Sequence, residues 1–76
     1  MTIAFVLLNT DAGVENQALR RMKAVTGVTE AYVTYGLYDI IAKVEADSQQ
    51  KVKEIIFSKI RGIDEVKSTL TLVVAE

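Results

Sequence analysis

The chain has 76 residues and a formal net charge of −1 at pH 7, with nine lysines and arginines against ten aspartates and glutamates. It contains no cysteine and no histidine, which excludes disulfides, thiolate or imidazole metal sites, cysteine nucleophiles and serine–histidine–aspartate triads. Half of its residues are apolar, whereas a domain this small buries only about 60% of its unfolded surface. We therefore expect a single domain over residues 1–76 that gains stability from a partner subunit.

Charge and hydropathy also limit the partners of the protein. The basic surplus of a nucleic-acid-binding domain is missing, so no direct contact with nucleic acid is expected. The apolar run at residues 3–8 is far too short to span a membrane, and we expect neither a membrane association nor a signal peptide. The absence of cysteine fits a cytoplasmic protein. No cofactor and no metal are expected.

The first half of the chain predicts a strand followed by a helix. Residues 2–8 form a β-branched and apolar run, typical of a strand buried on both faces. Residues 9–11 are types that cap helices. Apolar residues then recur at helical spacing over residues 14–25, which indicates an amphipathic helix. Gly27 is expected to cap the end of that helix.

The middle of the chain predicts a hairpin. Residues 28–35 are β-branched and aromatic, which favours a second strand. Gly36 interrupts this pattern, and it resumes over residues 38–44 as a third strand.

A second helix and a last strand follow. Asp47 and Ser48 are helix-capping types, and Gln50 follows Asp47 at the spacing of a capping box. An apolar stripe over residues 52–60 predicts the helix. Residues 66–74 predict the closing strand.

An internal repeat supports this order of elements. Residues 25–30 (VTGVTE) match residues 60–65 (IRGIDE) thirty-five positions later. Each half therefore predicts a helix, a glycine stop and a strand. Two interleaved βαβ halves predict an α+β, ferredoxin-like fold, in which a four-stranded antiparallel sheet carries both helices on one face.

The other face of that sheet should be polar if it meets water. Alternation along the first and last strands instead places apolar side chains on both faces. One such set comprises Ile3, Phe5 and Leu7 on the first strand and Leu70 and Leu72 on the last. An apolar face of this kind is typical of an interface. We therefore predict a homodimer in which two sheets meet about a two-fold axis.

The hairpin loop carries the residues best suited to a small ligand. Gly36 can adopt a positive φ, which turns the backbone tightly and exposes its amides. Backbone amides suit a carboxylate, and the Asp39 carboxylate suits an ammonium group. Tyr35 and Tyr38 add flat surfaces and hydroxyl groups. These residues allow an amino-acid site, although a glycine followed by an aspartate that bonds its own turn is also ordinary turn chemistry.

Two short motifs in this arrangement resemble the effector domain, called RAM, of the Lrp/AsnC family of feast/famine transcription regulators. They are G-L-Y-D at residues 36–39, before an apolar strand, and S-T-L-T at residues 68–71 on the last strand, with Gly62 between them. The resemblance covers essentially the whole chain. It implies a βαββαβ domain that dimerises through its sheet, assembles as dimers into an octameric ring, and binds amino acids at contacts between dimers.

The resemblance also implies a role and a set of ligand-binding residues. Family regulators carry an N-terminal helix-turn-helix, whereas here Met1 is followed at once by the first strand. We therefore expect a stand-alone effector domain that responds to amino acids or joins full-length relatives, and that modulates transcription or metabolism without binding DNA. The implied ligand-binding residues are Tyr35, Gly36, Leu37, Tyr38 and Asp39 in the loop, with Thr69 and Thr71 ranked below them.

Alternative interpretations stay open. An ACT-like regulatory module shares this fold and binds its ligand after the first strand, where Gly13 lies in this chain. A small dimeric α+β-barrel enzyme has the same architecture, but such chemistry usually uses a placed histidine, and the adjacent Tyr38 and Asp39 point to opposite faces of a strand. We expect no catalytic residue and no enzymatic activity. A purely structural partner in an oligomer is the remaining alternative.

Overall fold

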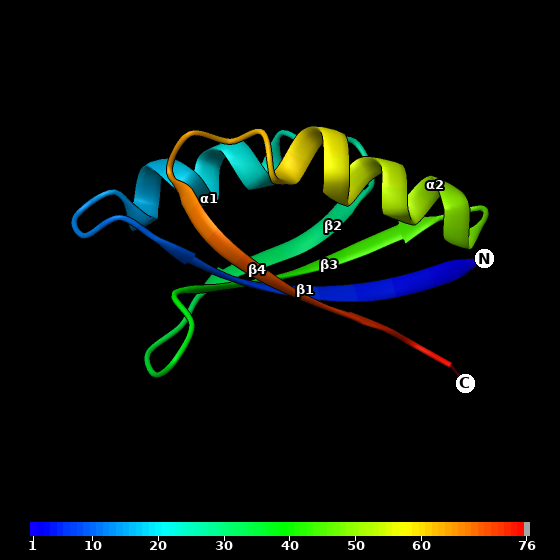
Figure 1. Cartoon of the computed structure of the whole chain (residues 1–76), viewed down its shortest axis with the longest axis horizontal. Helices are drawn as coiled ribbons and strands as arrows, with labels where there is room; N and C mark the ends of the chain where they lie inside the picture. Colours follow the sequence, from blue (N-terminus) through cyan, green and yellow to red (C-terminus); the bar gives the residue numbers. More distant parts are fainter. Residues whose placement is uncertain (76) are drawn as a thin grey trace.

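The structure, a computed structural model, describes residues 1–75. Its elements follow the predicted βαββαβ order, and both helical segments lie on one side of a single sheet (Figure 1). This confirms the ferredoxin-like α+β prediction. The elements are β1 (Thr2–Thr10), α1 (Glu15–Lys23), β2 (Val28–Val33), β3 (Ile40–Ala46), α2 (Gln49–Glu54), its continuation η1 (Ile55–Ile60) and β4 (Val66–Val73).

The strand order across the sheet is β2-β3-β1-β4, and every neighbouring pair is antiparallel. The first strand is therefore central and pairs with both β3 and β4. The two edges of the sheet are formed by β2 and β4, which lie at opposite sides of the molecule.

The central strand alternates strictly between a covered and an uncovered face. Ala4, Val6 and Leu8 are fully buried under the helices, whereas Phe5 and Leu7, which point the other way, are only half-buried. The expectation that this strand is buried on both faces is therefore not met in the single chain. The reason is that the helices cover one face only (Figure 1).

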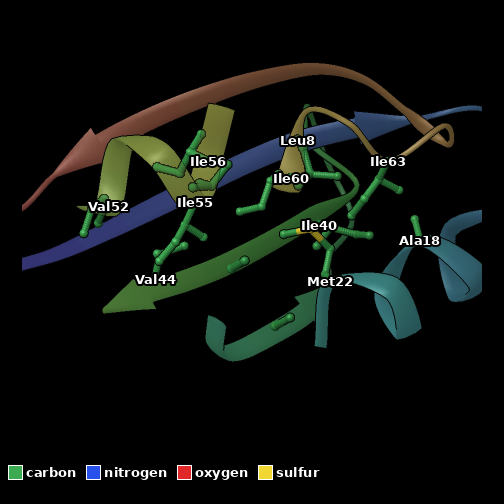
Figure 2. Packing of buried hydrophobic residues seen from close by; sticks show 14 residues of the cluster. Leu8, Ala18, Met22, Ile40, Val44, Val52, Ile55, Ile56, Ile60 and Ile63 are labelled. Atoms are coloured by element: carbon green, nitrogen blue, oxygen red, sulfur yellow. The ribbon is translucent and has the colours of Figure 1, made fainter. Parts of the chain in front are cut away.

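The core forms where the helical segments meet the covered face. Ala18 and Met22 from α1 and Val52 and Ile60 from α2 and η1 are fully buried. Figure 2 shows these side chains converging over the sheet from the two helical segments. Their spacings of four and eight residues explain why the apolar stripes in the sequence predicted both helices.

The start of α1 differs from the prediction. Residues 9 and 10 are still part of β1, so they cannot cap the helix. The N-cap position is Val14, whose side chain makes no capping hydrogen bond. Close by, the Gly13 N–H donates to Glu15 Oε1 over 3.3 Å. The predicted cap at residues 9–11 is therefore wrong, because the strand continues through the polar residues.

The second helical segment begins near the predicted place and ends in an unexpected way. Ser48 is the N-cap, and its Oγ accepts a hydrogen bond from the Lys51 N–H over 3.1 Å. The cap is thus Ser48 rather than Asp47. From Ile55 onward the helix widens into the π-helix η1, which ends with the Arg61 N–H donating to Ile56 O over 3.0 Å.

Gly27 lies beyond the end of α1, which finishes at Lys23. Its φ is +103°, and a Cβ there would stand 2.6 Å from Ile55 Cδ1. The Gly27 carbonyl accepts a hydrogen bond from the Glu45 N–H over 2.8 Å. Because Gly27 has no side chain, the α1–β2 turn can lie close to β3 and η1. This close packing, rather than helix capping, is the main role of Gly27.

Within residues 1–75, neither helical segment has the length and apolar character needed to cross a bilayer.

Candidate ligand site

The loop of residues 34–39 joins β2 to β3 and projects from the side of the sheet that carries no helix (Figure 1). Both strands are shorter at this end than the sequence predicted, because pairing stops between Val33 and Ile40. Two hydrogen bonds close the base of the loop. The Thr34 N–H donates to Asp39 O, and Thr34 Oγ1 donates to Tyr38 O, each over 2.8 Å.

The tip of this loop is highly exposed. Gly36 has a φ of +132°, and no atom lies within 4 Å of where its Cβ would be. The neighbouring side chains of Tyr35 and Leu37 have relative exposures of 103% and 90%. Among the described residues, the amides from Tyr35 to Tyr38 have no protein acceptor. The loop therefore presents backbone donors and apolar side chains together.

Asp39 connects the loop to the central strand. Its N–H donates to Leu8 O over 3.0 Å, and its Oδ2 accepts from the Thr10 N–H over 2.9 Å. The carboxylate thus bonds to β1 rather than to its own turn. Its second oxygen has no bonded partner among residues 1–75. This arrangement fixes the side chain while leaving one carboxylate oxygen available.

Thr69 and Thr71 lie on the opposite face of the sheet from this loop. They sit on the edge strand β4, opposite Leu8 and Val6, whose side chains face the helices. Both threonines therefore also face the helical side, where they line a groove of about 570 Å³ between β4 and the α2–η1 segment. Within one chain the structure brings the five loop residues together but separates them from the two threonines.

The helix-free face has an apolar part and a charged part. Along β1 and β4 it presents apolar residues, including the exposed Leu70 and Leu72. Along β2 and β3, Lys43 Nζ pairs with Glu30 Oε2 at 3.7 Å, and the Tyr32 hydroxyl donates to Glu30 Oε1 over 2.7 Å. This hydrogen bond, together with the charge of Glu30, raises the pKa of Tyr32. The face predicted to dimerise is thus apolar on one half and rimmed by charge on the other.

Two features of the surface were not predicted from the sequence. One is the groove beside β4, which depends on where the second helix lies over the sheet. The other is the ion pair of Arg21 Nε with Glu65 Oε1 at 3.3 Å, which ties α1 to the segment before β4. The exposed Phe57, on an otherwise charged side of its helix, is the signal in the sequence that could have pointed to the groove. Within residues 1–75, no group of three acidic side chains gathers as a metal site.

A family profile described as the Lrp/AsnC ligand binding domain matches residues 3–76. The chain belongs to this family. The regulatory protein AsnC of Escherichia coli K12 is 41% identical over 59 residues, which cover 78% of this chain and 39% of AsnC. This Lrp/AsnC domain therefore corresponds to only about half the length of that regulator, since its fold matches 51% of the E. coli AsnC chain.

Solved structures agree with this assignment. The crystal structure of FFRP-DM1 matches with a TM-score of 0.92 and 40% identity, and the match covers 97% of this chain and 99% of that one. The Neisseria meningitidis regulator NMB0573, solved as a complex with L-Met, matches with a TM-score of 0.85 over 99% of this chain and 50% of that chain. At 10% identity, this second likeness concerns the fold alone.

One relative of this Lrp/AsnC domain is an enzyme. Homocitrate synthase of Sulfolobus acidocaldarius is 39% identical over 70 residues, which cover 91% of this chain but only 15% of the enzyme. The similarity is thus confined to a small part of that protein.

Proposed function

We propose that this domain binds a free amino acid at the loop of residues 34–39, and that binding shifts the assembly of its subunits. It acts as a regulatory domain and not as an enzyme. The observation that carries the proposal is the pairing of unbonded amides at the loop tip with an aspartate that has one carboxylate oxygen available. An amino acid offers the two complementary charges.

The loop matches the two ends of such a ligand. The ligand carboxylate accepts hydrogen bonds from the amides around Gly36, where the positive φ turns the backbone outward. The ligand ammonium group pairs with Asp39 Oδ1. Because the Thr10 N–H already holds the other oxygen, Asp39 needs little rearrangement to receive it. Tyr35 and Leu37 add apolar contacts to the ligand side chain.

The family and its relatives support a small-molecule role. The family is described as a ligand-binding domain, and a protein of the same fold was solved with L-Met. Related sequence occurs both in a regulatory protein and in an enzyme. A domain that senses a small molecule is useful both in a transcription regulator and in an enzyme, whereas a DNA-reading domain is useful only in the regulator. The described residues contain no helix-turn-helix, so this domain supplies no DNA-reading element itself.

The separation of the predicted site residues favours a ligand held between chains. The loop projects from the helix-free side of the sheet, whereas Thr69 faces the helical side, so we propose that a ligand that contacts both is shared by two molecules. We propose that the apolar sheet faces form dimers and that a second contact, closed by the ligand, joins dimers into an octameric ring or joins them to full-length Lrp/AsnC regulators. The ligand shifts this equilibrium only through its higher affinity for the assembled state.

Calorimetry and native mass spectrometry with the twenty standard amino acids test the proposal. We expect at least one amino acid to bind and to change the subunit count. Asp39→Asn keeps an acceptor for the Thr10 N–H but removes the charge, and should weaken binding at least tenfold, or about 1.4 kcal/mol. Asp64→Asn, at another exposed aspartate, is the charge control and should bind as the unmodified chain does.

A second pair of variants separates this loop from the one after β1. Gly36 and Gly13 both have positive φ, and at both positions no atom lies within 4 Å of where a Cβ would stand. Gly36→Ala should abolish the binding, while Gly13→Ala should leave it intact. Loss of binding in Gly13→Ala alone would move the site to the loop used by ACT-like modules. A panel in which no amino acid binds would overturn the proposed function.

A further inference from the structure

The edge strand β4 carries backbone groups that no strand of this chain uses. Within the sheet β4 pairs with β1 alone, so its outer side is open. Because α2 packs over β1 and β3, the helix-facing side of β4 is also uncovered, and the groove lies there between β4 and the α2–η1 segment. An open sheet edge is where some domains bind an extended peptide as an added strand.

The open backbone groups belong to the residues of β4 that line the groove. The Val74 N–H donates to Ile3 O over 2.8 Å, so Val74 directs its backbone groups toward β1. Along a strand, the backbone groups of successive residues point to opposite sides. Thr69, Thr71 and Val73 therefore direct their N–H and C=O groups away from β1, while their side chains face the groove. A strand added here would place alternate side chains in the groove.

The helical wall of the groove is apolar. It includes Ile56, which is buried, and Phe57, which is 69% exposed. Phe57 lies in the π-helix η1, a rare conformation that occurs frequently at functional sites. An apolar side chain of an added strand can pack against this wall.

Cations without carboxylate partners lie at the groove. None of the ion pairs within residues 1–75 involves Lys53 or Arg61, which both line it. The Arg61 guanidinium lies over the Phe57 ring, with its carbon 4.8 Å from the ring centroid, which holds it in place with its donors available. The one acidic residue of the lining, Glu54, pairs with Lys51 at 3.8 Å. The groove therefore attracts carboxylates.

These charges argue against a second copy of β4 as the occupant. The only charged residue within Val66–Val73 is Lys67, which lies with Arg61 around an adjoining hollow of about 430 Å³. A second β4 would bring another lysine and no carboxylate to a surface that already carries unpaired cations, and like charges on paired strands are destabilising. Charge complementarity favours a strand from a different protein that carries acidic side chains.

We propose that β4 and the groove bind an extended acidic segment of another protein, which joins the sheet as a fifth, antiparallel strand. The backbone of this segment bonds to the outward groups of β4. On its groove side, a central apolar side chain packs against Phe57, and carboxylates on either side of it pair with Arg61 and Lys53. A free amino acid has no backbone that can form such a ladder, so this surface for a protein partner is separate from the proposed ligand loop.

A heptapeptide with capped ends, in which threonines alternate with glutamate, leucine and glutamate, tests this surface on the full chain. Its leucine and both glutamates lie on one face of the extended peptide, and its caps remove the terminal charges. We expect saturable binding that slows hydrogen exchange at the Thr69, Thr71 and Val73 amides but not at Leu70 and Leu72, whose amides already point to β1. The matching peptide with lysine for glutamate should bind at least tenfold more weakly. No saturable binding of the glutamate peptide, or protection confined to other strands, would overturn the proposal.

Methylation of single peptide nitrogens tests the strand pairing. In the proposed antiparallel pair the leucine N–H faces β4, whereas the N–H of the next threonine faces away. N-methylation of the leucine should therefore weaken binding at least tenfold, and N-methylation of that threonine is the control and should change it little. Equal binding of the two methylated peptides would contradict an added strand.

Charge reversal assigns the contact to the groove. Arg61→Glu should weaken binding of the glutamate peptide at least tenfold and strengthen binding of the lysine peptide, a gain that unfolding could not produce. Lys59→Glu makes the same kind of change in η1 outside the groove lining and should alter neither by as much. Phe57→Ala should weaken the binding of both peptides. Equal effects of the Arg61 and Lys59 variants would contradict the site.

Two further measurements separate this proposal from its competitors. Asp39→Asn should leave peptide binding unchanged, so failure of the amino-acid loop and failure of the β4 surface are distinguishable. Protection of the Thr69 and Thr71 amides that rises with the concentration of the chain alone, and that the peptide does not displace, would show that a second copy occupies β4 and would overturn the proposal.

Discussion

Individual residues in this domain act through partners that are distant in the sequence. Asp39 holds the Thr10 amide of β1, 29 positions away, and Gly27 makes room for Ile55 of η1. Each of these contacts fixes a turn against an element from another part of the chain. Substitutions at such positions therefore test the tertiary arrangement rather than the local turn.

Gly27→Ala should destabilise the fold more than an equivalent change elsewhere. In addition to the strain at a φ of +103°, the new Cβ forces the buried Ile55 side chain, whose Cδ1 lies 2.6 Å away, to shift within the core, so we expect a loss of about 2 kcal/mol in the free energy of unfolding. Gly13→Ala has a similar backbone strain without a contact within 4 Å and should cost about 1 kcal/mol. Urea unfolding at one fixed protein concentration measures both. Equal losses would show that the packing against Ile55 is unimportant.

The sequence predicts the conformation of these residues better than their contacts. Its pattern marks Gly36 as a turn residue, and the positive φ is present in the structure. The bond from Thr10 to Asp39 could not be predicted, because it depends on the register between β1 and β3. Local spacing alone allows only a bond from Asp39 to its own turn. Whether the five loop residues bind a ligand stays a prediction.

At the scale of elements, apolar periodicity predicts every strand and helix but not their finer geometry. Val52, Ile56 and Ile60 recur at intervals of four, which an α-helix explains fully, so nothing in that pattern indicates the π-helix. The groove could not be predicted for a related reason. It depends on where α2 sits across the sheet, and periodicity reports which side of a helix is buried but not which strands it covers.

Ser48→Ala should destabilise the start of α2. The Ser48 Oγ is the only side-chain acceptor for the first-turn amides of this helix among residues 1–75, so its loss should cost about 1 kcal/mol. Asp47→Ala, one residue earlier and outside the cap, is the control and should change stability by less than about 0.5 kcal/mol. Thermal unfolding by circular dichroism compares them. A larger loss for Asp47→Ala would restore the capping box that the sequence suggested.

At the scale of the whole molecule, the helix-free face is the surface through which we propose that the domain dimerises. Its apolar part runs along β1 and β4, which means that the two-fold axis of the proposed dimer lies nearer to these strands than to the charged pair on β2 and β3. This asymmetry could be derived only with the strand order known. Alternation in the sequence predicted apolar residues on this face. The strand order β2-β3-β1-β4 adds that they lie on the half of the face formed by β1 and β4.

Leu72→Lys should weaken the dimer. Leu72 is 54% exposed on the helix-free face of β4, and a lysine there places an unpaired charge in the interface. We expect dimer dissociation to rise at least tenfold, or about 1.4 kcal/mol, in sedimentation equilibrium. Val33→Lys changes an exposed apolar strand residue on the helical face and should leave the dimer intact. Equal dissociation in both variants would contradict the face-to-face dimer.

The position of β4 at the edge of the sheet has a consequence for the separated chain. An edge strand leaves a row of backbone donors and acceptors unpaired, which other strands can join. Within Val66–Val73 the sole charged residue is Lys67, and the stretch after it alternates threonine with leucine and valine. Such a segment has the composition of fibril-forming strands. The proposed dimer would therefore also protect against aggregation, since a single chain exposes both an apolar face and an edge strand that other strands can join.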